Sequence, residues 1–275
     1  MNGRGFHRVG LVRKRSIPLS LPVNNSLSVR LTQPQLGNEM EKVLVIDDEK
    51  PTLMMFRLTL EAYGFDVLTA ENGREGLEIF SHDRPRIVLT DIKMPGMNGI
   101  EVLKQIKEID PAAEVIVITG HGDMDIAIQA LNLDATDFIN KPIQRHLLEQ
   151  ALERVRERQR LSAEQIQEIV LESAEGAAVL IVRGNISAKN ESRFQTLFHE
   201  AAALEKPRIV LNFLESAAVN GAGIAVLTQL LLESQKEGRH VVVAGLSENL
   251  RKVFDIVGLS KLVPMADSLA EAMTV

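Results

Sequence analysis

Short apolar runs rich in β-branched residues recur along the first half of the chain, and they alternate with segments of helical periodicity. Strands that alternate with helices predict a parallel sheet covered by helices on both faces. The predicted strands lie near residues 42–47, 66–70, 86–91, 114–119 and 136–140. The predicted helices lie near residues 51–63, 73–82, 99–109, 123–133 and 143–160. We therefore expect an α/β domain with a five-stranded, doubly wound parallel sheet.

Polar residues stand at or just beyond the ends of four of these strands. They are Asp47 and Asp48, Asp91, Thr119 and Lys141. Ligands of such sheets bind outside the carboxyl ends of the strands, so three carboxylates, a hydroxyl and an ammonium should converge there. This set can hold Mg²⁺ beside a phosphoryl group, and a carboxylate such as Asp91 can accept that group as a nucleophile. Each residue alone has an ordinary explanation as a cap, strand or turn residue, but their joint placement favours a phosphoryl site.

The second half of the chain, residues 167–275, reads as a smaller α/β unit. Strand-like runs occupy 179–182, 209–211 and 241–243, and Glu175-Gly176 is a hairpin signal between two early strands. Helical patterns cover residues 190–204, 221–236, 247–257 and 266–273. The acidic residues of this half are dispersed over predicted helix surfaces, so we expect no catalytic set in it.

The segment that joins the two halves has two interpretations. Apolar and polar residues continue in one register at alternating steps of four and three: Leu148, Leu152, Val155, Gln159, Ser162, Ile166 and Ile169. This spacing fits a short coiled coil between two protomers, and it equally fits an ordinary last helix with one apolar face. The intervening charged residues, Arg154 among them, are expected to be exposed in either case.

Composition restricts the kinds of site that the chain can hold. Its 275 residues allow about two domains. The absence of cysteine excludes disulfides, thiol catalysis and cysteine-ligated metals. No apolar stretch reaches the length of a transmembrane helix, so we expect no membrane span.

Residues 1–39 differ from the rest in charge. They carry a net charge of +5, which leaves −11 for the remainder of a chain whose total is −6. The acidic body argues against nonspecific DNA binding by the folded part. The first 39 residues could be a basic arm that touches nucleic acid or membrane, a targeting peptide, or a tail outside the fold that includes a mis-called start. We favour the last interpretation, because Met40 runs straight into the first predicted strand.

Four motifs in the first half resemble the receiver domain of bacterial response regulators. They are VIDDE at 45–49, LTDIKMPGMNG at 89–99, ITGHG at 118–122 and DFINKP at 137–142. The resemblance covers about residues 42–160 and keeps the order and spacing of the family's functional positions. It implies a flavodoxin-like sheet, a cytoplasmic protein, a sensor histidine kinase as partner, and a homodimer through the face at 123–160.

The same resemblance assigns roles to individual residues. It implies Asp91 as the phospho-acceptor. Asp47, Asp48 and Asp91 are implied as Mg²⁺ ligands, with the backbone carbonyl of Lys93 as a further ligand. It also implies Lys141 as the contact to the phosphoryl group, and Thr119 and Phe138 as a switch pair. In that switch the Thr119 hydroxyl moves toward the phosphoryl oxygens, and the Phe138 ring fills the space that it leaves.

The second half resembles the STAS domain of anti-sigma-factor antagonists. The motifs that carry this resemblance are VLIVRGNI at 179–186, IVLNFL at 209–214, VNGAGI at 219–224 and VVVAGL at 241–246. In that family the loop before the second helix usually reads DSSG or DSTG, and a kinase phosphorylates its second hydroxyl. Here the loop consists of Asn220, Gly221, Ala222 and Gly223. Ala222 stands at the acceptor position and cannot be phosphorylated.

We predict a receiver domain at 40–145, a helical linker at 146–166 and a STAS domain at 167–275. The hypothesis is a two-component regulator in which Asp91 controls binding of the STAS domain to an anti-sigma factor or a kinase-like protein. No direct DNA binding is expected, and no enzymatic activity beyond weak self-phosphorylation and self-dephosphorylation.

Other functions remain open at this stage. One is a STAS module that binds constitutively or senses a small molecule, with the receiver controlling dimerisation. DNA binding through the basic arm is another. An aspartyl-phosphate phosphatase is disfavoured, because such enzymes need an acid two residues after the nucleophile, where this chain has Lys93.

Overall fold

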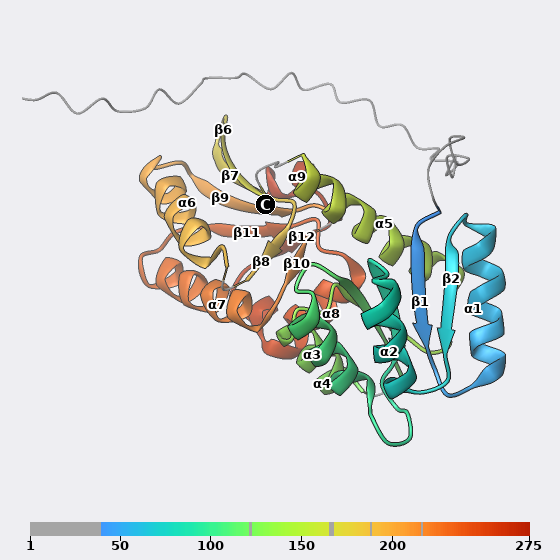
Figure 1. Cartoon of the computed structure of the whole chain (residues 1–275). Coiled ribbons are helices and arrows are strands. Elements are labelled where there is room, and N and C mark those ends of the chain that lie inside the picture. The colour runs from blue at the N-terminus through green and yellow to red at the C-terminus, as the bar shows by residue number, and fades with distance from the viewer. Residues whose placement is uncertain (1–39, 121–122, 165–167, 188, 216) are drawn as a thin grey trace, which may run out of the picture.

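The computed structural model describes residues 40–275 apart from 121–122, 165–167, 188 and 216. Two α/β units follow each other along this part of the chain, and helices α7 and α8 of the second lie beside α4 of the first (Figure 1). The predicted tail at 1–39 lies outside the described residues. Within the described part, no helix is both long and apolar enough to cross a lipid bilayer.

The first unit is built on five parallel strands in the order β2-β1-β3-β4-β5. The strands are β1 (Lys42–Ile46), β2 (Asp66–Ala70), β3 (Ile87–Asp91), β4 (Glu114–Thr119) and β5 (Asp137–Asn140). Every residue of β3 and β4 is buried, which explains why these runs are nearly all apolar and do not alternate with polar residues. The predicted doubly wound parallel sheet is confirmed.

Five helices cover the two faces of this sheet. They are α1 (Lys50–Ala62), α2 (Gly73–Asp83), α3 (Gly99–Ile109), α4 (Met124–Asn132) and α5 (Arg145–Ala163). Helices α1 and α5 pack on one face through residues such as Phe56 and Leu152, and α2 and α3 pack on the other through Phe80 and Val102. The Asn98 side chain begins α3 with a capping box, which fixes the loop that follows β3.

Helix α5 bears on the two interpretations of the linker. Leu148, Leu152 and Val155 are buried in the core of the first unit, so this part of the expected seam packs on the chain's own sheet. The helix ends at Ala163 and Ile169 begins a strand, so the seam does not continue along one helix to Ile169, and a contact between two protomers stays a prediction. The prediction that Arg154 is exposed is also wrong, because its guanidinium is buried in an ion pair with Asp137. Ile166 lies outside the described residues.

The second unit contains a mixed sheet in the order β12-β11-β9-β7-β6. Its strands are β6 (Ile169–Ala174), β7 (Ala177–Val182), β9 (Arg208–Phe213), β11 (Val241–Ala244) and β12 (Met265–Ala266), and a separate pair is formed by β8 (Asn185–Ile186) and β10 (Ala218–Val219). β6 runs antiparallel to β7 through the predicted hairpin, and the other neighbours in the sheet are parallel.

The helices of the second unit are α6 (Glu191–Ala203), α7 (Gly221–Lys236), α8 (Glu248–Val257) and α9 (Leu269–Ala272), with a 3₁₀ turn η1 (Leu259–Lys261). Phe194, Leu227 and Phe254 bring α6, α7 and α8 into one core, whereas α9 packs on the opposite face of the sheet. The helix predicted at 266–273 is too long, because strand β12 takes residues 265–266 and Ser268 caps the shorter helix.

We expect Gly99→Ala to destabilise the first unit. An added Cβ at Gly99 would lie 2.1 Å from the backbone oxygen of Asp91, and backbone at this point has little room to move. Such overpacking should cost about 1–3 kcal/mol in the free energy of unfolding, measurable by chemical denaturation. Gly120→Ala is the control, because the contact of its Cβ among the described residues is the carboxylate oxygen of Asp123, at 2.9 Å, at the end of a side chain that can rotate away. Equal stability of the Gly99 variant and the wild type would contradict the described packing.

Candidate functional site

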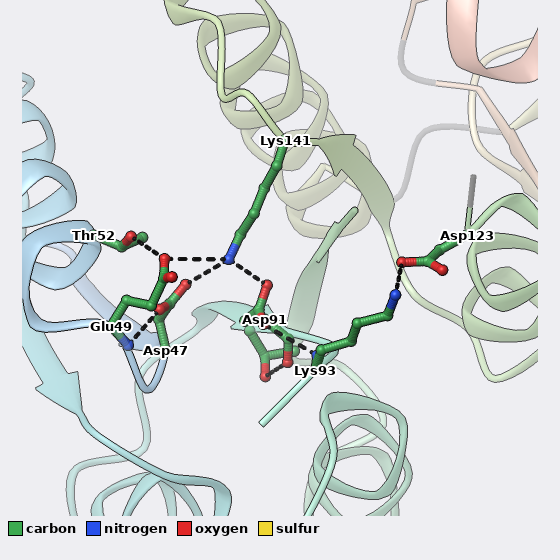
Figure 2. Close-up of polar contacts among 8 residues, drawn as sticks. Asp47, Glu49, Thr52, Asp91, Lys93, Asp123 and Lys141 are labelled. Atoms are coloured by element: carbon green, nitrogen blue, oxygen red, sulfur yellow. Dashed lines mark hydrogen bonds and ion pairs between the residues drawn. The ribbon is translucent and has the colours of Figure 1, made fainter. Parts of the chain in front are cut away.

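Two buried carboxylates and one ammonium meet at the carboxyl edge of the first sheet (Figure 2). Asp47 follows β1, Asp91 ends β3 and Lys141 follows β5. The Lys141 Nζ lies 2.8 Å from Asp91 Oδ1 and 3.3 Å from Asp47 Oδ2. The Asp47 side chain is 0% exposed and that of Asp91 is 6% exposed, so this charge pairing is shielded from water on the carboxylate side.

The pKa values of this cluster shift in a consistent way. Burial raises the pKa of Asp47, and the nearby charge of Asp91 adds to the rise, while the Glu49 backbone amide and Lys141 oppose it. For Lys141 burial acts to lower the pKa, but the bond to Asp91 and the two carboxylate charges outweigh it and raise the pKa. Lys141 therefore stays an ammonium at neutral pH, and its single charge is shared by the two buried carboxylates and the exposed carboxylate of Glu49, 3.9 Å away.

This donor set fits a small divalent cation. Asp47 and Asp91 offer hard oxygen atoms, and the raised pKa of Asp47 shows that its negative charge is incompletely compensated. Mg²⁺ is commonly held by one or two carboxylates and keeps several water molecules. Among the described residues, no three acidic or histidine side chains close around one point, so water would have to complete the shell. Asp48, predicted as a ligand, lies exposed beside Asp47.

Lys93 is placed next to Asp91 but its side chain turns away from it (Figure 2). Its backbone amide donates a hydrogen bond to Asp91 Oδ2 over 3.1 Å. Its Nζ lies 2.8 Å from Asp123 Oδ2 at the start of α4. This ion pair links the loops that follow β3 and β4, and sequence reasoning missed it because nothing in the spacing marks Asp123. The predicted metal contact through the Lys93 carbonyl stays a prediction.

The predicted switch residues lie on adjacent strands. Thr119 is fully buried and donates a hydrogen bond to Asn140 Oδ1 over 2.6 Å. Phe138, on β5, is 1% exposed. Strand register pairs Thr119 with Asn140, two residues along from Phe138. Asn140 was not predicted, although its position directly before Lys141 is the one signal that could have identified it.

The loop Asn220–Gly223 opens helix α7. The Asn220 side-chain oxygen accepts a hydrogen bond from the Gly223 amide, as an N-cap does. An added Cβ at Gly223 would lie 2.2 Å from the Ile186 carbonyl oxygen, so a close backbone approach requires this glycine. The Ala222 methyl offers no acceptor for a phosphoryl group. The loop is thus a structural turn that lacks a phosphorylation site of its own.

Two family models match successive parts of the chain. A family model described as the response regulator receiver domain matches residues 43–153, and the STAS domain model matches residues 168–272. The chemotaxis protein CheY of Thermotoga maritima is 40% identical over 116 residues, which are 42% of this chain and 97% of CheY.

A second curated relative is longer than this chain. The C4-dicarboxylate transport transcriptional regulatory protein DctD of Rhizobium meliloti (strain 1021) is 39% identical over 122 residues, covering 44% of this chain and 26% of DctD. The chain therefore spans about a quarter of the length of DctD. A crystal structure of a response regulator receiver domain protein from Clostridium thermocellum is 40% identical, covers 45% of this chain and 99% of its own, and has a TM-score of 0.44.

We expect Asp47→Asn to stabilise the metal-free protein. Because the folded-state pKa of Asp47 is raised, the folded chain holds this proton more tightly than the unfolded chain, and ionisation costs stability as the pH rises above the ordinary value of 3.8. At neutral pH the amide should therefore raise the free energy of unfolding, by roughly 1 kcal/mol. Mg²⁺ should stabilise the wild type by mass action and the variant much less.

Thermal unfolding with and without Mg²⁺ measures both effects. Asp48→Asn is the matched control, because its exposed carboxylate should change the response to Mg²⁺ but leave the metal-free stability within about 0.5 kcal/mol. An Asp47→Asn protein that is less stable without metal, or that keeps the full stabilisation by Mg²⁺, would contradict the account of this site.

Proposed function

This chain belongs to the response regulators, with a receiver domain followed by a STAS domain, and on that premise we propose that Asp91 is its phospho-acceptor. A sensor histidine kinase supplies the phosphoryl group. The observation that carries this proposal is the position of Lys141, whose ammonium lies 2.8 Å from Asp91 Oδ1 at the carboxyl edge of the sheet. A cation at this place can pair with an oxygen of a phosphoryl group bound to Asp91.

The transfer is a nucleophilic displacement at phosphorus. An Asp91 carboxylate oxygen forms a bond to the phosphorus of a phosphohistidine, the P–N bond breaks, and the departing imidazole takes up a proton. Asp47, Asp48, Asp91 and the Lys93 carbonyl would hold Mg²⁺, which when bound neutralises charge on the phosphoryl oxygens. The Lys93 amide, which donates to Asp91 Oδ2, orients the carboxylate for attack.

Thr119 then transmits the effect of phosphorylation at Asp91 to strand β5. Its hydroxyl now donates to Asn140, and an anionic phosphoryl oxygen is a stronger acceptor than an amide oxygen. Rotation of Thr119 toward the phosphoryl group leaves space beside β5, into which the Phe138 ring can turn. Thr119 and Phe138 thereby convert the charge on Asp91 into a changed surface of α4 and β5.

The output is binding to another protein. We divide the chain into a receiver at 40–145, a linker helix at 146–166 and a STAS domain at 167–275. The STAS domain binds an anti-sigma factor or a kinase-like protein, and because Ala222 cannot be phosphorylated, Asp91 supplies the control. The protein acts in the cytoplasm without contacting DNA directly, and it forms a homodimer through the face at 123–160.

We expect a small phosphodonor with Mg²⁺ to place one phosphoryl group on the wild type and none on Asp91→Asn, as measured by intact mass. Lys141→Met should slow the labelling about tenfold or more, because the cation that pairs with the phosphoryl oxygens is lost. Lys104→Met on the exposed side of α3 is the charge-matched control and should label at the wild-type rate. Undiminished labelling of Asp91→Asn would reject Asp91 as the acceptor.

A further inference from the structure

The two domains share a small apolar cluster, which we call the interdomain contact. Ala127, Leu131 and Phe138 come from the receiver, and Val253 and Ile224 come from the STAS domain. Phe138 is 1% exposed and Val253 is 0% exposed. A cavity of ≈ 20 Å³ remains beside them, which is room for about one water molecule. The contact is therefore closely packed, and the predicted switch ring lies within it.

Polar side chains border this cluster. The Asn249 Nδ2 donates to the Phe138 backbone oxygen over 2.7 Å and to Asp137 Oδ1 over 3.0 Å. The Asn220 Nδ2 donates to Asp134 Oδ1 over 2.7 Å. Asp134 lies in the turn after α4 and has a left-handed backbone with φ of 62°, a conformation that aspartate adopts more readily than most residues. Both STAS amides act as donors, and the receiver offers three acceptors: the carboxylates of Asp134 and Asp137 and the backbone oxygen of Phe138.

The loop at the start of α7 has a shape that fits the receiver. An added Cβ at Gly221 would lie 2.3 Å from the Asn132 side-chain oxygen, at the end of α4. Glycine at this position therefore lets the loop approach α4 closely. The loop that holds the phosphorylation site in related STAS domains here faces the receiver of the same chain.

One strand joins the interdomain contact to the phosphorylation site. The Phe138 backbone oxygen accepts a hydrogen bond from Asn249 of the STAS domain. Two residues further along β5, the Asn140 side chain accepts a hydrogen bond from Thr119. Lys141 comes directly after Asn140 and forms an ion pair with Asp91. A displacement of Thr119 or of the Phe138 ring therefore acts on the same four-residue segment that binds the STAS domain.

From these contacts we infer that the Asn220–Gly223 loop and the first part of α8 form a docking surface for the receiver's own α4–β5 face. This contact within one chain keeps the STAS domain from its partner until phosphorylation of Asp91 releases it. The release step rests on the proposed function, whereas the docking contact does not. In this chain the receiver thus controls the loop. In related STAS domains a kinase controls the same loop by phosphorylating it.

Docking of the receiver on the STAS surface restricts which partner can bind there and when the dimer can form. A protein that replaces the receiver must offer an apolar patch for Ile224 and Val253, and acceptor oxygens for Asn220 and Asn249. Acidic side chains beside an apolar centre meet both needs. The STAS domain also covers part of the face at 123–160, so the proposed homodimer can form only after release.

The test measures the separation of the two domains by pulsed electron spin resonance. The chain has no cysteine, so Glu108→Cys on α3 and Lys236→Cys at the end of α7, both exposed, give one unique label pair. The opening variant combines Asp134→Gly, which keeps the left-handed turn but removes the acceptor, with Asn249→Ala. Asp134→Asn keeps an acceptor oxygen and is the matched control.

We expect one narrow distance distribution for the unphosphorylated wild type and for the control. The opening variant should show a second, longer distance, with the open population raised about tenfold by the lost hydrogen bonds. Mg²⁺ with beryllofluoride should produce the same longer distance in the wild type. An unchanged distribution in the opening variant would overturn the docking contact.

Fluorine NMR of bound beryllofluoride separates the remaining outcomes. If the wild type binds beryllofluoride and stays closed while the opening variant opens, the docking contact stands and the release step is overturned. If the wild type binds no beryllofluoride and Asp91→Asn behaves identically, the proposed role of Asp91 fails. The opening variant then still decides the docking contact.

Discussion

The placement of one ammonium between two buried carboxylates is the interaction on which the rest of the site depends. Lys141 connects the end of β5 to the ends of β1 and β3, and it offsets negative charge that burial would otherwise make costly. The raised pKa of Asp47 shows that this compensation is incomplete. A site with excess negative charge and one ammonium is suited to accept Mg²⁺ and a phosphoryl group together.

Strand β5 and the following lysine connect the carboxylate cluster to the STAS domain. Three residues of β5 and the following lysine make these contacts: Asp137 with Arg154, Phe138 with the STAS domain, Asn140 with Thr119, and Lys141 with Asp91. Asp137 is part of both an ion pair with Arg154 and a hydrogen bond with Asn249. Because the segment is short and buried, a change at one end is hard to absorb locally. A change at the proposed phosphoryl site or at the interdomain contact can therefore shift the position of β5.

Local sequence patterns were sufficient to predict the receiver sheet and the meeting of Asp47, Asp91 and Lys141 at its carboxyl edge. The apolar runs before Asp47 and Asp91 identify buried strands, and the chemistry of parallel sheets then places their polar neighbours together. The same reasoning was wrong for Arg154, since its burial depends on Asp137, 17 residues earlier in the chain. It could not find the pairing of Asn249 with Asp137 across 112 residues, because no periodicity encodes contacts between domains. The spacing of Leu148, Leu152 and Val155 was ambiguous because a coiled coil and a helix packed on a sheet require the same apolar face.

The central claim is that phosphorylation of Asp91 uncovers the STAS loop. Amide hydrogen exchange over residues 218–226, compared with and without Mg²⁺ and beryllofluoride, tests it most directly, with strand β7 as the internal reference. The account predicts exchange at least about tenfold faster in the loop when the site is filled, and unchanged exchange in β7. Equal protection of the loop in both states, with beryllofluoride bound at Asp91, would contradict it.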